Sequence, residues 1–149
     1  MTQPASVRVT TYVAVDALTA FEVFTEEIDL WYRRGPHNFF DPVRAIAIRF
    51  EPPGPDGRLL EIYDNESGEG REMATVTAWE PGRRLVLLDN RRTEIEVSFE
   101  DAGGGETKVT LEHRGLERLG PKEAESHVKF GGRLLFAWYS DHMRERTTR

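Results

Sequence analysis

The chain has 149 residues, enough for a single domain over residues 1–149 and too few for two ordinary ones. Its 20 basic and 26 acidic residues give a net charge of −6, which disfavours nucleic acid as a partner. The absence of cysteine excludes disulfides and thiolate metal sites and favours a reducing, cytoplasmic location. The sequence has no apolar run long enough to predict membrane insertion and no signal-like start that would predict export.

The first part of the chain predicts one strand followed by two short helices. Residues 7–15 alternate apolar and polar side chains, as a strand with one buried face does. Asp16 is a typical helix N-cap, and a short helix is expected over residues 17–25. A second short helix is expected over residues 27–32, and Gly35-Pro36 should end it.

The middle of the chain predicts six strands joined by turns rich in glycine and proline. In the first of them, the alternation places Ile46, Ile48 and Phe50 on the buried face. Strands joined by such short turns are antiparallel neighbours, and their alternation leaves one face of the sheet to be covered. The predicted strands cover residues 44–50, 58–63, 72–80, 84–88, 93–100 and 107–114.

A long helix is expected at the end of the chain, from Pro121 to about Arg144. Its apolar residues recur at spacings of three and four, which predicts one buried face. That stripe contains Ala124, Val128, Gly131, Leu135 and Trp138, with Leu134 beside it. The sequence therefore predicts an α+β fold in which a curved antiparallel sheet wraps the C-terminal helix and leaves an apolar cavity between them.

Three segments also carry a resemblance to a known family. They are residues 75–86 (TVTAWEPGRRLV), residues 104–116 (GGETKVTLEHRGL), and residues 16–25 followed by Trp31. In this order and spacing they resemble the SRPBCC or START-like superfamily, in the branch similar to the heat-shock-protein-90 ATPase activator. The resemblance implies the helix-grip fold and an internal cavity. Its members include lipid carriers, hormone receptors and polyketide cyclases, so the fold alone does not give the function.

The predicted ligand is a small hydrophobic or aromatic molecule, because cavities of this kind have mostly apolar walls. Trp31, Phe39 and Phe40 belong to the segment that resembles the lid of the family's cavity. Core packing is the alternative for each aromatic residue. The residues predicted to line the cavity are Trp31, Phe39, Phe40, Ile48, Trp79, Val97, His113, Gly131, Leu134 and Trp138.

Two glycines inside the last helix are costly, at roughly 1 kcal/mol each relative to alanine. Gly131 and Gly132 therefore predict a close approach to the helix backbone, either by a ligand in a widened cavity or by a neighbouring strand. His113 faces the same side as Val109 and Leu111, so it is a buried histidine that either exchanges a proton or is held in a structural hydrogen bond.

The sequence contains none of the motifs of a serine hydrolase, zinc protease, P-loop or dinucleotide site, and no cofactor is predicted. His37, His127 and His142 form no metal-binding spacing, so no metal site is predicted either. A cyclase-like or hydrolase-like enzyme remains an alternative, with Tyr63, Asp89, Arg91 and His113 as its polar groups. A chaperone or stress accessory module that binds other proteins is a third alternative, and a homodimer is expected from the edge strands.

Overall fold

The computed structural model describes residues 6–33, 39–89 and 92–147 of the chain. Gly35, Pro36, His37 and Arg91, which enter the predictions above, lie outside these ranges. Within them, none of the helices is long and apolar enough to cross a membrane.

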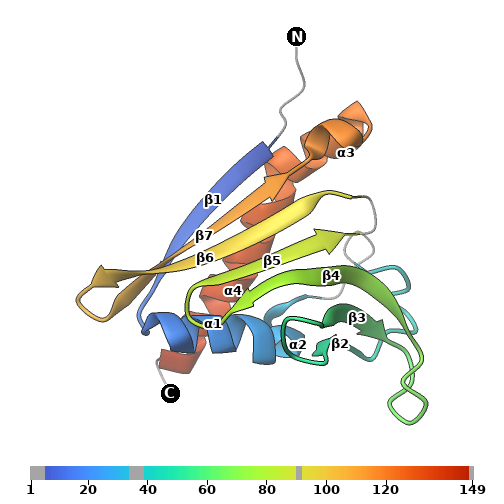
Figure 1. Cartoon of the computed structure of the whole chain (residues 1–149), viewed down its shortest axis with the longest axis horizontal. Coiled ribbons are helices and arrows are strands. Elements are labelled where there is room, and N and C mark those ends of the chain that lie inside the picture. The colour runs from blue at the N-terminus through green and yellow to red at the C-terminus, as the bar shows by residue number, and fades with distance from the viewer. Residues whose placement is uncertain (1–5, 34–38, 90–91, 148–149) are drawn as a thin grey trace.

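Seven strands form one antiparallel sheet in the order β1-β7-β6-β5-β4-β3-β2, so β1 and β2 are its edges (Figure 1). Register shifts interrupt the pairing of β3 with β4 and of β4 with β5. Such bulges bend a sheet, which helps this one to curve around the helices. The strands are β1 (Ser6–Val13), β2 (Ala47–Glu51), β3 (Arg58–Ile62), β4 (Gly70–Glu80), β5 (Arg84–Asp89), β6 (Glu94–Gly103) and β7 (Glu106–Arg114).

Two short helices, α1 (Ala17–Glu26) and α2 (Ile28–Trp31), follow β1, as the sequence predicts. Asp16 caps α1, because its Oδ1 accepts a 3.0 Å hydrogen bond from the backbone N–H of Thr19. Behind the sheet of Figure 1, α4 (Gly132–Thr147) crosses several strands. The architecture is therefore the predicted α+β helix-grip fold, a curved sheet that holds a C-terminal helix.

One predicted strand differs in its bounds and its faces. The sequence predicts residues 44–50 with Ile46 inside, but β2 begins at Ala47 and the side chain of Ile46 is 45% exposed. A turn precedes the strand, because the backbone N–H of Ala45 donates to the carbonyl of Asp41, and Ile46 joins β3 only through the bond from its N–H to the carbonyl of Ile62. The opposite face of β2 and β3 also buries a small apolar cluster, made of Ala47, Leu60 and Ile62.

The last helix is not one uninterrupted α-helix. Between α3 (Pro121–Ser126) and α4, the segment His127–Gly131 forms a π-helical turn, called the π-turn below. A π-turn contains about one residue more than an α-helical turn. Each later residue therefore takes the place on the helix surface that the residue before it would have in an uninterrupted α-helix. Ala124 before the turn is buried, but after it Gly132, Phe136 and Tyr139 are buried, each one place later than the stripe predicts, and Met143 is buried in the same row. The predicted positions Leu135 and Trp138 are only partly buried.

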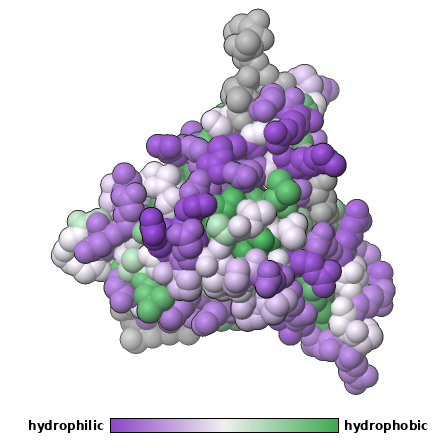
Figure 2. Space-filling model, in the orientation of Figure 1, coloured by the Kyte–Doolittle hydropathy of each residue, from purple (hydrophilic) through white to green (hydrophobic). Residues whose placement is uncertain are grey.

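The main core lies between the concave face of the sheet and the helices. Its buried side chains come from α1, α2, α4 and the inward positions of the strands, and His113 shares the buried side of β7 with Val109 and Leu111. Hydrophilic residues cover most of the face shown in Figure 2, and hydrophobic atoms appear there only in small areas.

Candidate functional site

A cavity of about 190 Å³ lies between α2, α4 and the concave face of the sheet. Most of its wall is aliphatic or aromatic, and Asp89 is the one charged residue among the described lining residues. This composition suits an apolar ligand with a single polar group. The lining consists of Phe24, Ile28, Trp31, Tyr32, Phe50, Leu59, Met73, Ala74, Leu87, Asp89, Ile95, Val97, Leu111 and Leu135.

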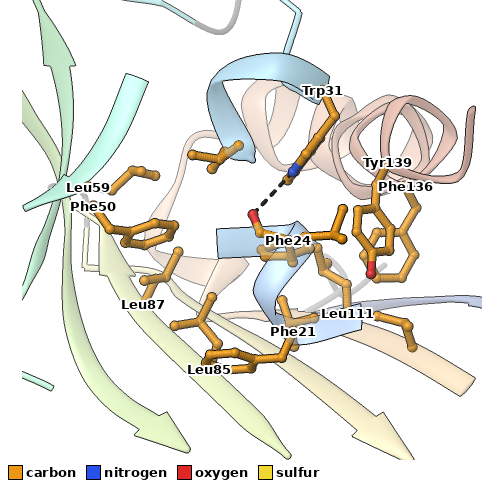
Figure 3. Packing of buried hydrophobic residues seen from close by; sticks show 14 of the residues in the cluster. Phe21, Phe24, Trp31, Phe50, Leu59, Leu85, Leu87, Leu111, Phe136 and Tyr139 are labelled. Atoms are coloured by element: carbon orange, nitrogen blue, oxygen red, sulfur yellow. Dashed lines mark hydrogen bonds between the residues drawn. The ribbon is translucent and has the colours of Figure 1, made fainter. Parts of the chain in front are cut away.

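An aromatic cluster from three helices fixes one side of this cavity (Figure 3). The ring centroids of Phe24 and Trp31 lie 4.9 Å apart, and each ring packs on Tyr139 of α4 at 5.3 and 5.5 Å respectively. The indole N–H of Trp31 donates a 3.1 Å hydrogen bond to the backbone carbonyl of Phe24, drawn as the dashed line. Because its polar atom is satisfied within the protein, the indole offers the cavity an apolar surface.

A chain of hydrogen bonds leads from Asp89 into the protein. Thr93, which is completely buried, donates to the Asp89 carboxylate twice, from its backbone N–H at 3.0 Å and from its hydroxyl at 2.6 Å. The Nε2 atom of His113 lies 2.8 Å from the same hydroxyl oxygen. Since the hydroxyl proton goes to the carboxylate, His113 Nε2 must be the donor, which assigns the Nε2–H tautomer.

The π-turn brings His127 against this chain. The rings of His113 and His127 meet edge to face with their centroids 4.8 Å apart. Burial, with a smaller contribution from the neighbouring His127, lowers the pKa of His113 from 6.5 to about 4, while Asp89 acts in the opposite direction. His113 is therefore neutral near pH 7 and serves as a hydrogen-bond donor to Thr93.

A buried carboxylate, Glu61 on β3, lies outside the described lining of the cavity. It accepts 2.8 Å hydrogen bonds from the backbone N–H groups of Phe40 and Asp41, and a 2.5 Å bond from the Tyr63 hydroxyl. Burial and this contact raise the pKa of Tyr63 to about 12. Glu61 thus anchors residues 40–41 to the sheet. The sequence gives no sign of this role, because its strand pattern treats Glu61 as an ordinary acidic residue.

The structure places two of the predicted ligand residues, Trp31 and Val97, in the cavity wall. Four others are packed close to it in the core. Ile48 is fully buried, and Phe39 lies 5.6 Å from Tyr32, a lining residue, between ring centroids. Trp138 packs on Tyr32 at 5.7 Å, and Trp79 packs on Phe50, another lining residue, at 5.5 Å. The three aromatic side chains support the wall from behind.

The structure corrects three of the predicted positions. Phe40 is 42% exposed, and the guanidinium carbon of Arg71 lies 3.8 Å from its ring centroid. Leu134 is 47% exposed because the π-turn rotates its position away from the core. A Cβ atom at Gly131 would lie 3.1 Å from Nδ1 of His127, so Gly131 makes room for that ring and does not widen the cavity.

Gly132 is the glycine that allows the close approach. A Cβ atom there would lie 3.0 Å from Cδ2 of Leu111 and 3.3 Å from Cγ2 of Val9, on β7 and β1. This is the second of the two interpretations of the glycine pair, in which neighbouring strands approach the helix backbone.

The polar residues suggested for catalysis do not gather in one place. Asp89 lines the cavity, and His113 reaches it only through Thr93. Tyr63 is bonded to Glu61 instead. In the described ranges, no three His, Asp or Glu side chains gather closely enough to hold a metal ion.

Two kinds of comparison place the chain among known proteins. The family described as Activator of Hsp90 ATPase homolog 1-like protein matches residues 15–141. No curated protein sequence matches the chain.

Several solved structures share its fold. The self-sacrificing resistance protein CalC from Micromonospora echinospora is similar at 24% identity with a TM-score of 0.66, over 95% of each chain. An anthrahydroquino-gamma-pyrone synthase, Txn09, in complex with SUM, is similar at 26% identity with a TM-score of 0.59, over 93% of this chain and 97% of the other. The Aha1 dimer from Colwellia psychrerythraea is similar at 13% identity with a TM-score of 0.64, over 94% of this chain and 96% of the other.

Proposed function

Because this chain belongs to the Activator of Hsp90 ATPase homolog 1-like family, a branch of the SRPBCC superfamily, we propose that it binds a small hydrophobic or aromatic molecule in its cavity. The observation that carries this proposal is the apolar lining, with its aromatic side fixed by Phe24 and Trp31. A similar protein, Txn09, is known in complex with a compound, SUM, which supports binding as the use of this fold.

The volume limits the size of the ligand. A cavity of roughly 150 Å³ is known to hold benzene, whereas drug-sized ligands need about 300 Å³ or more. At about 190 Å³, this cavity suits a single aromatic ring with a short substituent. A polycyclic compound needs more room than this.

Filling the cavity provides a direct test. Ala74 on β4 is buried in the lining, so Ala74→Leu places extra carbon atoms where the ligand would lie. We expect ethylbenzene to bind the unmodified protein in a calorimetric titration and to bind Ala74→Leu at least tenfold more weakly. Ala137→Leu on the exposed side of α4 is the matched control and should bind as the unmodified protein does. Equal affinities for all three proteins would exclude the cavity as the binding site.

An enzyme of the polyketide cyclase or hydrolase kind, acting in the same cavity, is the second candidate. The chain of hydrogen bonds from His113 through Thr93 to Asp89 favours it, because such a chain can orient a carboxylate next to a substrate. Binding is the better-supported function, because the described lining contains one ionisable carboxylate and His113 is not part of it. Turnover of a bound compound, followed by mass spectrometry, would favour the enzyme.

The proposal also covers the location and the oligomeric state of the protein. The lack of cysteine supports a reducing, cytoplasmic location. The edge strands β1 and β2 offer places for a second copy, and a similar protein is known as an Aha1 dimer, so a homodimer is proposed.

A further inference from the structure

The bulge in β4 decides which of its side chains line the cavity. In β3, Leu59 pairs with Ala74 of β4. The next residue, Leu60, pairs with Glu72, so Met73 is the extra residue of the bulge. Two consecutive side chains, those of Met73 and Ala74, therefore reach the cavity, where a regular strand would direct only one of them inward. Bulges that redirect a side chain in this way are over-represented next to functional sites.

Met73 lies on the side of the cavity that solvent reaches. Most of the described lining residues are buried, and the half-buried ones mark the mouth. Because the side chain of Met73 is among them, a solute hardly larger than water can reach it without any unfolding of the chain. The half-buried lining residues are Tyr32, Met73, Asp89, Ile95 and Leu135.

The sulfur atoms of the chain give this position its importance. The sequence has no cysteine and three methionines, at positions 1, 73 and 143. Met143 is only 2% exposed and belongs to the core, and Met1 lies outside the described ranges. Within those ranges, Met73 is the sulfur-bearing side chain that solvent reaches more readily.

Oxidation of this sulfur changes the character of the cavity wall. A lone pair of the thioether sulfur attacks hydrogen peroxide, and an S–O bond forms as the O–O bond breaks. The departing hydroxide takes the proton of the transferred oxygen and leaves as water, so the sulfur loses two electrons and the peroxide gains them. The product, methionine sulfoxide, is a polar group, and an apolar ligand that covers it must remove it from water.

We propose that Met73 is an oxidation site through which peroxide controls the cavity, with the thioether form binding an aromatic ligand and the sulfoxide form releasing it. This inference rests on the proposed function and adds a means of regulation to the same site. The change is reversible, because methionine sulfoxide reductases restore the thioether. In that step the oxygen leaves as water, and two thiols of the reductant become a disulfide.

The first test needs no variant. The full chain is treated with hydrogen peroxide, peptide mass spectrometry follows the gain of oxygen at Met73 and Met143, and calorimetry at pH 7 measures the affinity for ethylbenzene. We expect Met73 to be oxidised well before Met143, and the affinity to fall by about tenfold or more as Met73 is oxidised. Reductases for both sulfoxide epimers, supplied with dithiothreitol, should restore the affinity.

Two variants then locate the effect. Met73→Leu keeps an apolar side chain of similar volume that forms no sulfoxide, so peroxide should leave its affinity for ethylbenzene where it was before treatment. Met143→Leu removes the buried sulfur and should still show the full loss on oxidation. Each protein is compared with its own untreated sample, so any effect of the substitution on binding itself cancels.

The outcomes separate the two proposals. If the protein with a sulfoxide at Met73 binds ethylbenzene as tightly as before, the cavity binds its ligand but peroxide does not control it. If Met73→Leu loses affinity as the unmodified protein does, or if circular dichroism shows unfolding before binding is lost, the assignment to Met73 is wrong. If the untreated protein does not bind ethylbenzene, the proposed function fails and the regulation fails with it.

Discussion

The hydroxyl of Tyr139 in α4 donates a 2.7 Å hydrogen bond to the backbone carbonyl of Ala20 in α1. Both residues have no exposed surface, so this contact ties the last helix to the first in the middle of the core. Burial also raises the pKa of Tyr139, which keeps the hydroxyl protonated as a donor.

Replacing Tyr139 with phenylalanine removes this donor but keeps the ring. We expect the free energy of unfolding to fall by about 1–2 kcal/mol, because the carbonyl of Ala20 loses its side-chain partner. Urea denaturation measures the change. Tyr12→Phe, at a side chain that is 57% exposed, should stay within about 0.5 kcal/mol of the unmodified protein. A loss of the same size in both variants would contradict the special role of Tyr139.

His113 predicts a particular dependence of stability on pH. Its pKa is about 4 in the folded protein and 6.5 in a free side chain, so between these values the unfolded chain binds the extra proton. Stability from this residue is therefore complete above pH 6.5 and falls as the pH drops toward 4. Its neighbours on the facing elements are Thr93, Asp89 and His127.

The measurement compares the unmodified protein with His113→Gln at pH 7 and pH 5. One pKa unit corresponds to about 1.4 kcal/mol, so the unmodified protein should lose roughly 1–2 kcal/mol more than the variant between these two pH values. Titratable groups that lie away from His113 contribute equally in both proteins and cancel in the difference. An identical loss in the two proteins would show that His113 is not held neutral by the fold.

Any side chain larger than that of glycine at position 132 of the last helix should lower the stability of the protein. Replacing a glycine inside a helix stabilises the helix by about 1 kcal/mol. A leucine at this position, however, must push against Leu111 and Val9, and such overpacking costs roughly 1–3 kcal/mol or more. We expect Gly132→Leu to lower the free energy of unfolding by about 1–2 kcal/mol in urea. Arg133→Leu, at an exposed position next to it, is the control. A gain in stability for Gly132→Leu would mean that the strands can move aside.

Much of the fold could be predicted because alternation and turn residues are local signals. The strand over residues 107–114 is an example, since Val109, Leu111 and His113 all face inward as their parity requires. The strand over residues 44–50 is predicted less well. The turn at Asp41 precedes β2, and Glu61 of β3 holds it by accepting the backbone N–H of Asp41. This contact, and the apolar cluster on the far face of β3, join residues distant in the sequence.

The candidate site is less predictable than the fold. Trp31 and Val97 reach the cavity, but the prediction for Leu134 is wrong because it assumes an uninterrupted α-helix. Periodicity cannot show the π-turn, which places His127 against His113 of a strand distant in the sequence. The position of Asp89 in the wall likewise depends on how β5 and β6 are held together by Thr93.

The π-turn also has a consequence for how relatives of this protein can differ. Deleting one residue from the segment 127–131 would restore ordinary α-helical geometry and leave everything after it facing the same way. Phe136 and Tyr139 would keep their inward places. A relative without the π-turn would thus be one residue shorter here with the same side chains inward, and an ungapped alignment with it would pair the wrong side chains along the rest of the helix.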